Sequence, residues 1–252
     1  MGYPDLLPSN YSDACPRVAD CSETTKMPCN IPLDPSSPEV DDIIEEVWRE
    51  LTHTSVDDKA GPPPLIDEVI HMGGDEPVLD CWRKSNRIKS YMEKNHFNSY
   101  EELLVDFIHR INSIGIGLGK RPTIWEEAWG TMPDSLDKRT IVNVWKIPST
   151  PRIVFDATMR GHNVIVNTNM YLDWQDMPWT RMYDIDLLLA SPPLSSEQEE
   201  LVLGGEVSVW SERIDLSNQD SLVWPRAAMG AQLFWNGKQV RMPDNCTAKV
   251  YC

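Results

Sequence analysis

The stretch VIHMGGDE, from Val69 to Glu76, is the most informative part of this chain. Its first four residues are typical of a short buried strand. Two glycines follow, and glycine allows a backbone to bend tightly beside a ligand. Two adjacent carboxylates, Asp75 and Glu76, then stand at the strand end. Because a bare Asp-Glu pair is more often a solvated turn than a site, the functional interpretation depends on the glycines and the strand before them.

Strand-like and helical segments alternate along the rest of the chain. Strands are expected at 69–72, 122–125, 141–145 and 163–166, and a last one from 201. Helices are expected from Pro38 and from Pro225 and at 151–160, and capping boxes at Ser99/Glu102 and Ser195/Gln198 predict two more helix starts. This alternation predicts a parallel sheet with helical crossovers.

The chemistry-bearing residues follow the strands. Each strand-like segment ends in Asp, Glu, Trp, Tyr or Gly, and a (β/α)8 barrel builds its active site at the C-terminal ends of its strands. An open doubly wound sheet also binds ligands at strand ends, but usually at one crevice. Several successive strand ends of this kind favour the barrel.

The composition disfavours some classes of binding partner and favours another. The chain has 252 residues and a formal net charge of −16, which disfavours nucleic acid and anionic membranes as partners. No apolar stretch is long enough to span a membrane, and the first residues do not resemble a signal peptide. Ten tryptophans are more telling, because an indole is a flat apolar wall on which sugar rings stack.

Six cysteines favour an oxidising compartment. They are Cys15, Cys21, Cys29, Cys81, Cys246 and Cys252. No CxxC pair and no histidine at ligand spacing accompanies them, so no metal site is expected. Disulfides are favoured instead, and two sequons, at Asn10 and Asn245, agree with that.

From the glycine-carboxylate motif onward the chain resembles family 20 β-N-acetylhexosaminidases, whose hallmark is a His-x-Gly-Gly-Asp-Glu strand end. The resemblance covers about residues 65–237 well and the first 64 loosely. Further elements match in order: Cys81-Trp82, the segment 124–127, Val144-Trp145, the segment 169–173, the segment 204–212, and Trp224-Pro225-Arg226-Ala227-Ala228.

The resemblance implies a glycoside hydrolase in which the substrate's acetamido oxygen attacks the anomeric carbon. Asp75 would orient the acetamido group and stabilise its positive charge. Glu76 would act as general acid and then as general base, which calls for a dry environment that keeps it protonated. The implied substrate-binding residues are Trp125, Trp145, Tyr171, Asp173, Trp210 and Glu212. His71 is interpreted as a structural residue, and Trp48, Trp82 and Trp235 as packing residues.

The same resemblance implies no cofactor and no metal. The expected partner is a carbohydrate with terminal N-acetylglucosamine or N-acetylgalactosamine, with a dimer left open. The expected location is lysosomal or secreted. The family also implies a disulfide from Cys81 to Cys15, Cys21 or Cys29, whereas Cys246 with Cys252 is suggested by proximity alone.

The chain departs from the family at its start. Val69–Met72 resembles the fourth barrel strand, so strands four to eight are expected and the first three, with a substrate-binding arginine, have no counterpart. Residues 1–64 are expected to form an irregular loop and one helix, 65–237 the C-terminal part of the barrel, and 238–252 a tail. An incomplete gene product, one piece of an assembly and an inactive relative all stay open. The alternative function is a non-catalytic sugar-binding or interaction protein.

Overall fold

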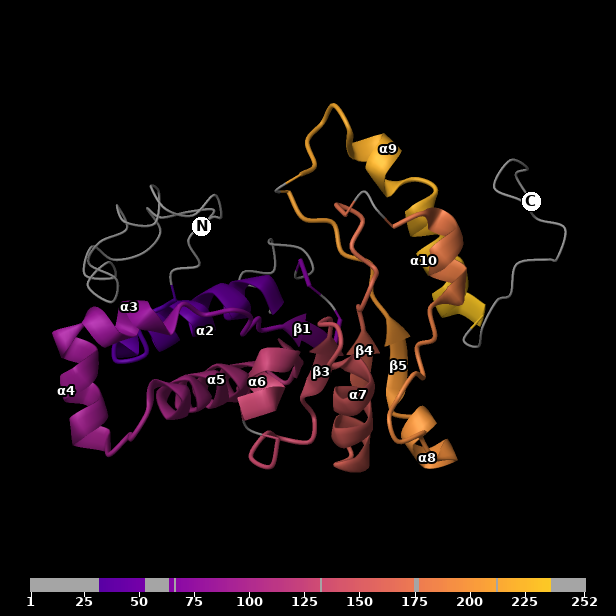
Figure 1. Ribbon diagram of the computed structural model, residues 1–252. Coiled ribbons are helices and arrows are strands. Elements are labelled where there is room, and N and C mark those ends of the chain that lie inside the picture. The colour runs from indigo at the N-terminus through magenta and orange to yellow at the C-terminus, as the bar shows by residue number, and fades with distance from the viewer. Residues whose placement is uncertain are drawn as a thin grey trace, which may run out of the picture. The chain divides into compact units, whose positions relative to one another are not determined.

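The structure, a computed structural model, describes residues 32–52, 64–65, 67–131, 133–174, 177–211 and 213–236. The chain divides into two compact units, Met1–Leu136 and Asp137–Cys252. Each unit contains short parallel strands joined through helices, as Figure 1 shows. The predicted α/β organisation is confirmed, whereas the numbering of the strands within a barrel and the predicted domain bounds stay predictions.

The first unit contains two parallel strands and five helices among its described residues. The strands are β1 (Val69–His71) and β2 (Arg121–Trp125), with Val69 opposite Arg121 and His71 opposite Thr123. The helices are α2 (Pro38–Thr52), α3 (Leu79–Lys84), α4 (Asn86–Asn95), α5 (Tyr100–Gly117) and α6 (Glu126–Thr131). Helix α5 packs against α2 and β2, and Arg110 of α5 forms ion pairs with Asp41 of α2 and with Asp106.

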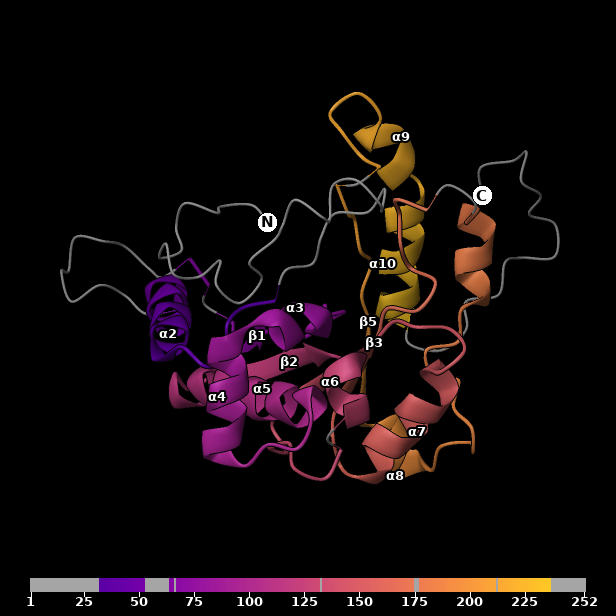
Figure 2. The ribbon, with the colours of Figure 1, turned by 60° about the vertical axis from the view of Figure 1, so that its left-hand side comes forward.

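In its described part the second unit contains three parallel strands, β3 (Ile141–Val144), β4 (Val164–Val166) and β5 (Val202–Gly205), with β4 paired to both neighbours. Its helices are α7 (Thr150–Met159), the 3-10 helix η3 (Trp179–Asp184), α8 (Ser196–Glu199), α9 (Gln219–Val223) and α10 (Arg226–Asn236). Every residue of β3 is buried, as expected for a parallel strand covered on both faces. Figure 2 shows α10 beside β5, against which it packs.

The predicted strands are all present, and five helical segments were not predicted. The segments missed are α3, α4, α6, η3 and α9. The Ser195/Gln198 capping box is confirmed in full. At the other predicted box, Ser99 accepts a hydrogen bond from the Glu102 N–H, but the Glu102 carboxylate accepts from the Asn98 N–H instead of that of Ser99. The reciprocal half of that box is therefore displaced by one residue.

Of the tryptophans predicted to pack in the core, one is buried and another is exposed. Trp82 is 1% exposed, and its Nε1–H donates to the Leu33 carbonyl at 3.0 Å, so its packing role is confirmed. Trp235 is 91% exposed near the end of α10, so the prediction that it packs is wrong. Its position on the helix gives the physical reason, because the buried face of α10 carries Arg226, Gly230 and Leu233.

Candidate active site

The bend after β1 carries the two predicted catalytic carboxylates. Backbone hydrogen bonds from the Met72 N–H to the Thr123 carbonyl and from the Trp125 N–H to the Gly73 carbonyl, 2.8 and 3.0 Å long, hold the strand end against β2. The chain then turns through positive φ angles of 76° at Gly73 and 101° at Gly74. These angles explain the two glycines, because a side chain is disfavoured in that conformation.

Asp75 and Glu76 leave this bend as exposed side chains. Glu76 itself has a φ of 37°, so the turn continues through the pair. Neighbouring residues on a regular strand point to opposite sides, and the bend removes that restriction. Both side chains are exposed, however. The predicted dry environment of Glu76 is therefore wrong for this structure, because a residue in an open turn keeps its contact with water.

His71 and Trp125 form a packed support beneath the bend. Their ring centroids lie 4.5 Å apart, and Trp125 is 7% exposed. The Gly73 N–H donates to His71 Nδ1 at 3.0 Å, so the imidazole accepts at that nitrogen. Burial lowers the pKa of His71 to about 4, which keeps the ring neutral at ordinary pH. The structural role predicted for His71 fits these contacts.

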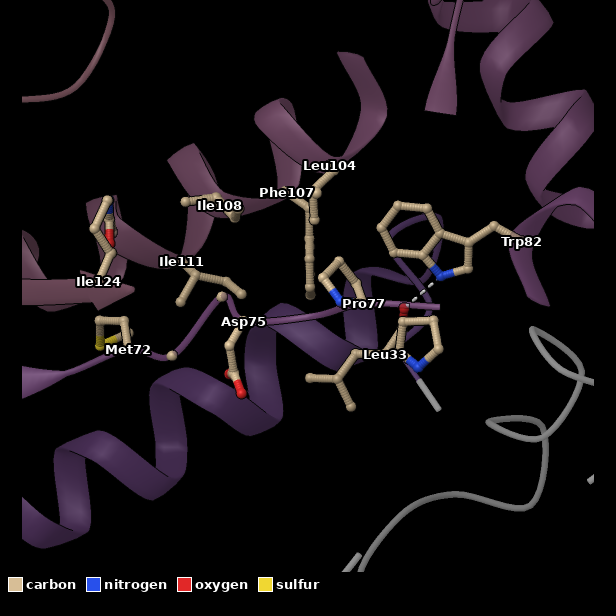
Figure 3. Close-up of a pocket in the computed structure, with 14 residues that line it drawn as sticks. Leu33, Met72, Asp75, Pro77, Trp82, Leu104, Phe107, Ile108, Ile111 and Ile124 are labelled. Carbon is tan, nitrogen blue, oxygen red and sulfur yellow. Dashed lines mark hydrogen bonds between the residues drawn. The ribbon is translucent and has the colours of Figure 1, made fainter. Parts of the chain in front are cut away.

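A cavity of about 320 Å³ also borders the motif. Figure 3 shows that its wall is mostly apolar, with Phe107, Ile108 and Ile111 of α5 on one side. Asp75 lies at its edge, with the carboxylate turned away from Ile108 and Ile111. A negative charge is costly in apolar surroundings, so this cavity is a poor place for the predicted charge stabilisation.

In the second unit, an aromatic group follows β3 and β4. The rings of Trp145 and Tyr171 have centroids 5.9 Å apart, and Tyr171 stacks on Trp174 at 5.1 Å with an interplanar angle of 24°. Tyr171 is bridged to Ser208, and the Leu172 N–H donates to the Ser208 carbonyl at 2.8 Å. The structure therefore brings Trp145 and Tyr171 together, as the sequence predicted, and adds Trp174.

Three predicted substrate-binding residues remain: Asp173 and Glu212 for sugar hydroxyls, and Trp210 as an apolar wall. Asp173 is 4% exposed, and its Oδ1 atom is buried with no hydrogen-bond partner among the described residues. Trp210 is 40% exposed, and Glu212 lies outside the described residues. A buried acceptor without a partner costs folding free energy. A group that donated a hydrogen bond to Asp173 Oδ1 would remove that cost.

Two polar residues of the second unit had no predicted role. Glu206 follows β5 and accepts a hydrogen bond from Asn143 Nδ2 at 2.7 Å. Burial raises the pKa of the Glu206 carboxyl, and the Asn143 hydrogen bond opposes this effect. Arg226, the first residue of α10, is 7% exposed. Both residues belong to elements of the family resemblance, the segment 204–212 and Trp224-Pro225-Arg226-Ala227-Ala228. The sequence could therefore have marked them as candidates.

Other predictions reach beyond the described residues or across both units. Asp75, Glu76 and Trp125 belong to the first unit, and the other described site residues to the second, so the enclosure they would form together stays a prediction. Cys81 is disulfide-bonded, but the other five cysteines lie outside the described residues, as do both sequons. No described helix combines the length and the apolar character that crossing a membrane requires.

Comparison with known proteins gives a consistent result. Residues 3–238 match a family model described as "Glycosyl hydrolase family 20, catalytic domain". The chain is 31% identical to beta-hexosaminidase subunit B1 of Dictyostelium discoideum over 249 residues, which cover 94% of this chain and 42% of that protein. It is 30% identical to the human beta-hexosaminidase subunit beta over 182 residues, covering 71% of this chain and 32% of the relative. The chain thus spans less than half the length of these curated relatives.

Solved structures agree on the fold. A chitobiase of Flavobacterium johnsoniae superimposes with a TM-score of 0.69 and 28% identity, covering 81% of this chain and 30% of that chain. An exo beta-N-acetylglucosaminidase of Vibrio harveyi, solved with N-acetylglucosamine, gives a TM-score of 0.68 at 24% identity over 83% of this chain and 33% of its own. The second likeness shows the fold alone.

Proposed function

Since this chain belongs to glycosyl hydrolase family 20, we propose that it removes terminal N-acetylhexosamine residues from oligosaccharides or glycoconjugates by substrate-assisted hydrolysis. The bend after β1 is the observation that carries this proposal. Positive φ angles at Gly73, Gly74 and Glu76 turn two adjacent carboxylates off the strand. Two carboxyl groups with different tasks are what glycoside hydrolysis requires.

The reaction has two balanced steps. In the first, the acetamido carbonyl oxygen bonds to the anomeric carbon while the glycosidic C–O bond breaks, and Glu76 gives its proton to the leaving oxygen. In the second, water attacks the same carbon, Glu76 takes the proton of that water, and the oxazolinium ring opens. Two inversions at one carbon leave its configuration retained.

Asp75 is the charge-stabilising residue of this proposal. The oxazolinium intermediate is a cation, and a fixed carboxylate close to it lowers its free energy. His71 and Trp125 support that position, because their packing and the Gly73 hydrogen bond fix the backbone from which Asp75 extends. The exposed setting of Glu76 implies that bound sugar supplies the dry surroundings which this chain alone does not.

The proposed sugar-binding residues are Trp125 of the first unit and five residues of the second. Tyr171 would donate to the acetamido oxygen, with Trp125, Trp145 and Trp210 as apolar walls. Asp173 and Glu212 would accept from sugar hydroxyls, and the unpartnered Oδ1 of Asp173 supports its part in this proposal. The proposed location is lysosomal or secreted, in keeping with a disulfide at Cys81.

The test is the hydrolysis of 4-nitrophenyl N-acetyl-β-D-glucosaminide by the purified chain. Glu76→Gln removes the acid and should lower kcat by about 100- to 10,000-fold. Glu93→Gln is the matched control, because Glu93 is an exposed glutamate on α4 of the same unit. It should keep the wild-type rate.

Two results would count against the proposal. One is wild-type turnover that survives Glu76→Gln, since it would assign the proton transfer to another group. The other is binding of N-acetylglucosamine with no hydrolysis under any condition, which would favour the non-catalytic sugar-binding alternative.

A further inference from the structure

Arg226 is buried at the start of α10, and all its donors are used by backbone carbonyls. Nε donates to the Leu222 carbonyl at 3.1 Å, and Nη1 donates to the carbonyls of Trp174 at 2.7 Å and Met177 at 3.4 Å. Nη2 donates to the carbonyls of Leu172 and Leu222. A guanidinium has five N–H groups, so these five bonds exhaust its donors.

Two of these carbonyls flank one residue, and a third follows it in the chain. Leu172 and Trp174 are the immediate neighbours of Asp173, and Met177 follows shortly after. Arg226 therefore fixes the backbone on both sides of Asp173. Through Leu222 the same guanidinium joins this segment to α9. A single side chain thus sets the position from which the Asp173 carboxylate extends.

Asp173 needs a neighbouring positive charge. It is 4% exposed, and burying a carboxylate without a counter-charge is costly. Burial lowers the pKa of the Arg226 guanidinium, and the charge of Asp173 opposes that lowering, so the two groups attract each other. Since no Arg226 donor is left over, the attraction involves no hydrogen bond to the carboxylate. Asp173 Oδ1 accordingly has no hydrogen-bond partner among the described residues.

We propose that Arg226 is a positioning residue for sugar binding, which holds Asp173 in place and balances its charge while leaving the carboxylate free to accept from a sugar hydroxyl. A direct ion pair with two hydrogen bonds would stabilise the Asp173 carboxylate more strongly but would occupy its oxygens. The carbonyl-bound guanidinium avoids that competition. The proposal rests on the proposed function for its ligand, but its electrostatic part can be tested without sugar.

The first arm is a double-mutant cycle measured by urea unfolding at pH 7. Arg226→Gln should lower the unfolding midpoint, because it leaves Asp173 buried without its counter-charge. Adding Asp173→Asn to the Arg226→Gln variant should raise the unfolding midpoint again. Asp173→Asn made alone in the wild-type chain should not raise the midpoint. The exposed pair Arg139 and Asp137 of the same unit is the control, and the same cycle there should show little coupling.

The second arm is a fluorescence titration with N-acetylglucosamine. Arg226→Lys keeps the charge with three donors and should weaken binding less than Arg226→Gln, for which we expect a loss of about 10-fold or more. A purely structural arginine predicts that both variants lose affinity only as far as they lose stability. Wild-type chain that binds no N-acetylglucosamine would overturn the proposed function but leave the first arm intact.

Additive effects of Arg226→Gln and Asp173→Asn would overturn the inference, because they would show that the two side chains do not interact. If Arg226→Gln does not fold, the double variant carries the test. Recovery of folding in the double variant supports the charge relation. Failure of the double variant together with normal folding of Asp173→Asn alone contradicts it.

Discussion

The strand end of β1 in the first unit and the strand ends of β3, β4 and β5 in the second provide opposite environments. After β1, two carboxylates stand exposed on a turn with positive φ angles. In the second unit, Asn143 and Asn167 are fully buried, and Asn167 Nδ2 donates to Ser208 Oγ at 2.7 Å. The first region presents its two carboxylates to water, whereas the second buries its asparagines and uses their Nδ2 atoms as hydrogen-bond donors.

The two regions therefore suit different tasks. Groups that exchange protons with a substrate must be reachable, whereas groups that orient a substrate gain from being fixed beforehand. Each hydrogen-bonded pair, Asn143 with Glu206 and Asn167 with Ser208, restricts the motion of both its members. In the second unit, hydrogen bonds therefore restrict the side chains that make them, whereas the turn after β1 leaves its two carboxylates accessible to water.

Acid should destabilise the first region through His71, and this is the largest effect expected. The pKa of His71 in the folded chain is about 4, against an ordinary value of 6.5. The unfolded chain therefore binds the proton more tightly, and stability is lost as pH falls from about 6.5 to about 4. The full loss is roughly 3 kcal/mol. Urea unfolding between pH 7 and pH 4 measures it.

His71→Phe should flatten that pH dependence, since the ring contact with Trp125 is kept and the titrating group is removed. His96→Asn is the control, because His96 is exposed at a left-handed position that asparagine tolerates. An unchanged slope in His71→Phe would break the contrast between the two regions.

The second-largest effect should come from overpacking in the second region, which should lower the unfolding free energy. A Cβ atom on Gly205 would lie 2.4 Å from Phe234 Cε1 and 3.0 Å from Leu187 Cδ2, so Gly205→Ala should cost about 1–3 kcal/mol of unfolding free energy. Gly130→Ala meets nothing within 4 Å on helix α6 and should instead stabilise by up to about 1 kcal/mol. Denaturant unfolding compares the two.

A smaller effect of opposite pH sense should come from Glu206. Burial raises the pKa of its carboxyl, so the stability it contributes is present at low pH and is lost as pH rises past the ordinary 4.5. Glu206→Gln keeps the acceptor for Asn143 and removes the charge. Its Tm should exceed that of the wild type at pH 7, and the difference should shrink towards pH 4. A larger gain at pH 4 would contradict the assignment.

The sequence predicted the regular elements with strong local signals and missed those held by distant contacts. The five strands and the helix at 38–52 follow apolar patterns, and helices α5 and α8 follow the capping residues Ser99 and Ser195. Helix α3 is only six residues long and is anchored by Trp82 on the Leu33 carbonyl, 49 positions away in the chain. Helix α6 begins directly where β2 ends. The sequence pattern therefore assigns Glu126 and Glu127 to the strand end and not to the start of a helix.

For the site, the sequence named candidate residues but not their environments. The family resemblance implied roles for Asp75, Tyr171 and Asp173, whereas the exposure of Glu76 depends on which parts of the chain lie over it. The role of Arg226 was hidden for a related reason. The hydrogen-bond partners of Arg226 are backbone carbonyl groups, which every residue has. No pattern of side chains in the sequence can therefore predict which carbonyls it binds.

The most direct test of the central claim compares two substrates that differ only at the 2-position. The purified chain should hydrolyse 4-nitrophenyl N-acetyl-β-D-glucosaminide with a kcat/KM on the order of 1,000-fold or more above that for 4-nitrophenyl β-D-glucoside, because only the first carries its own nucleophile. Equal values for the two substrates would contradict the account, since they would show that the acetamido group takes no part in the reaction.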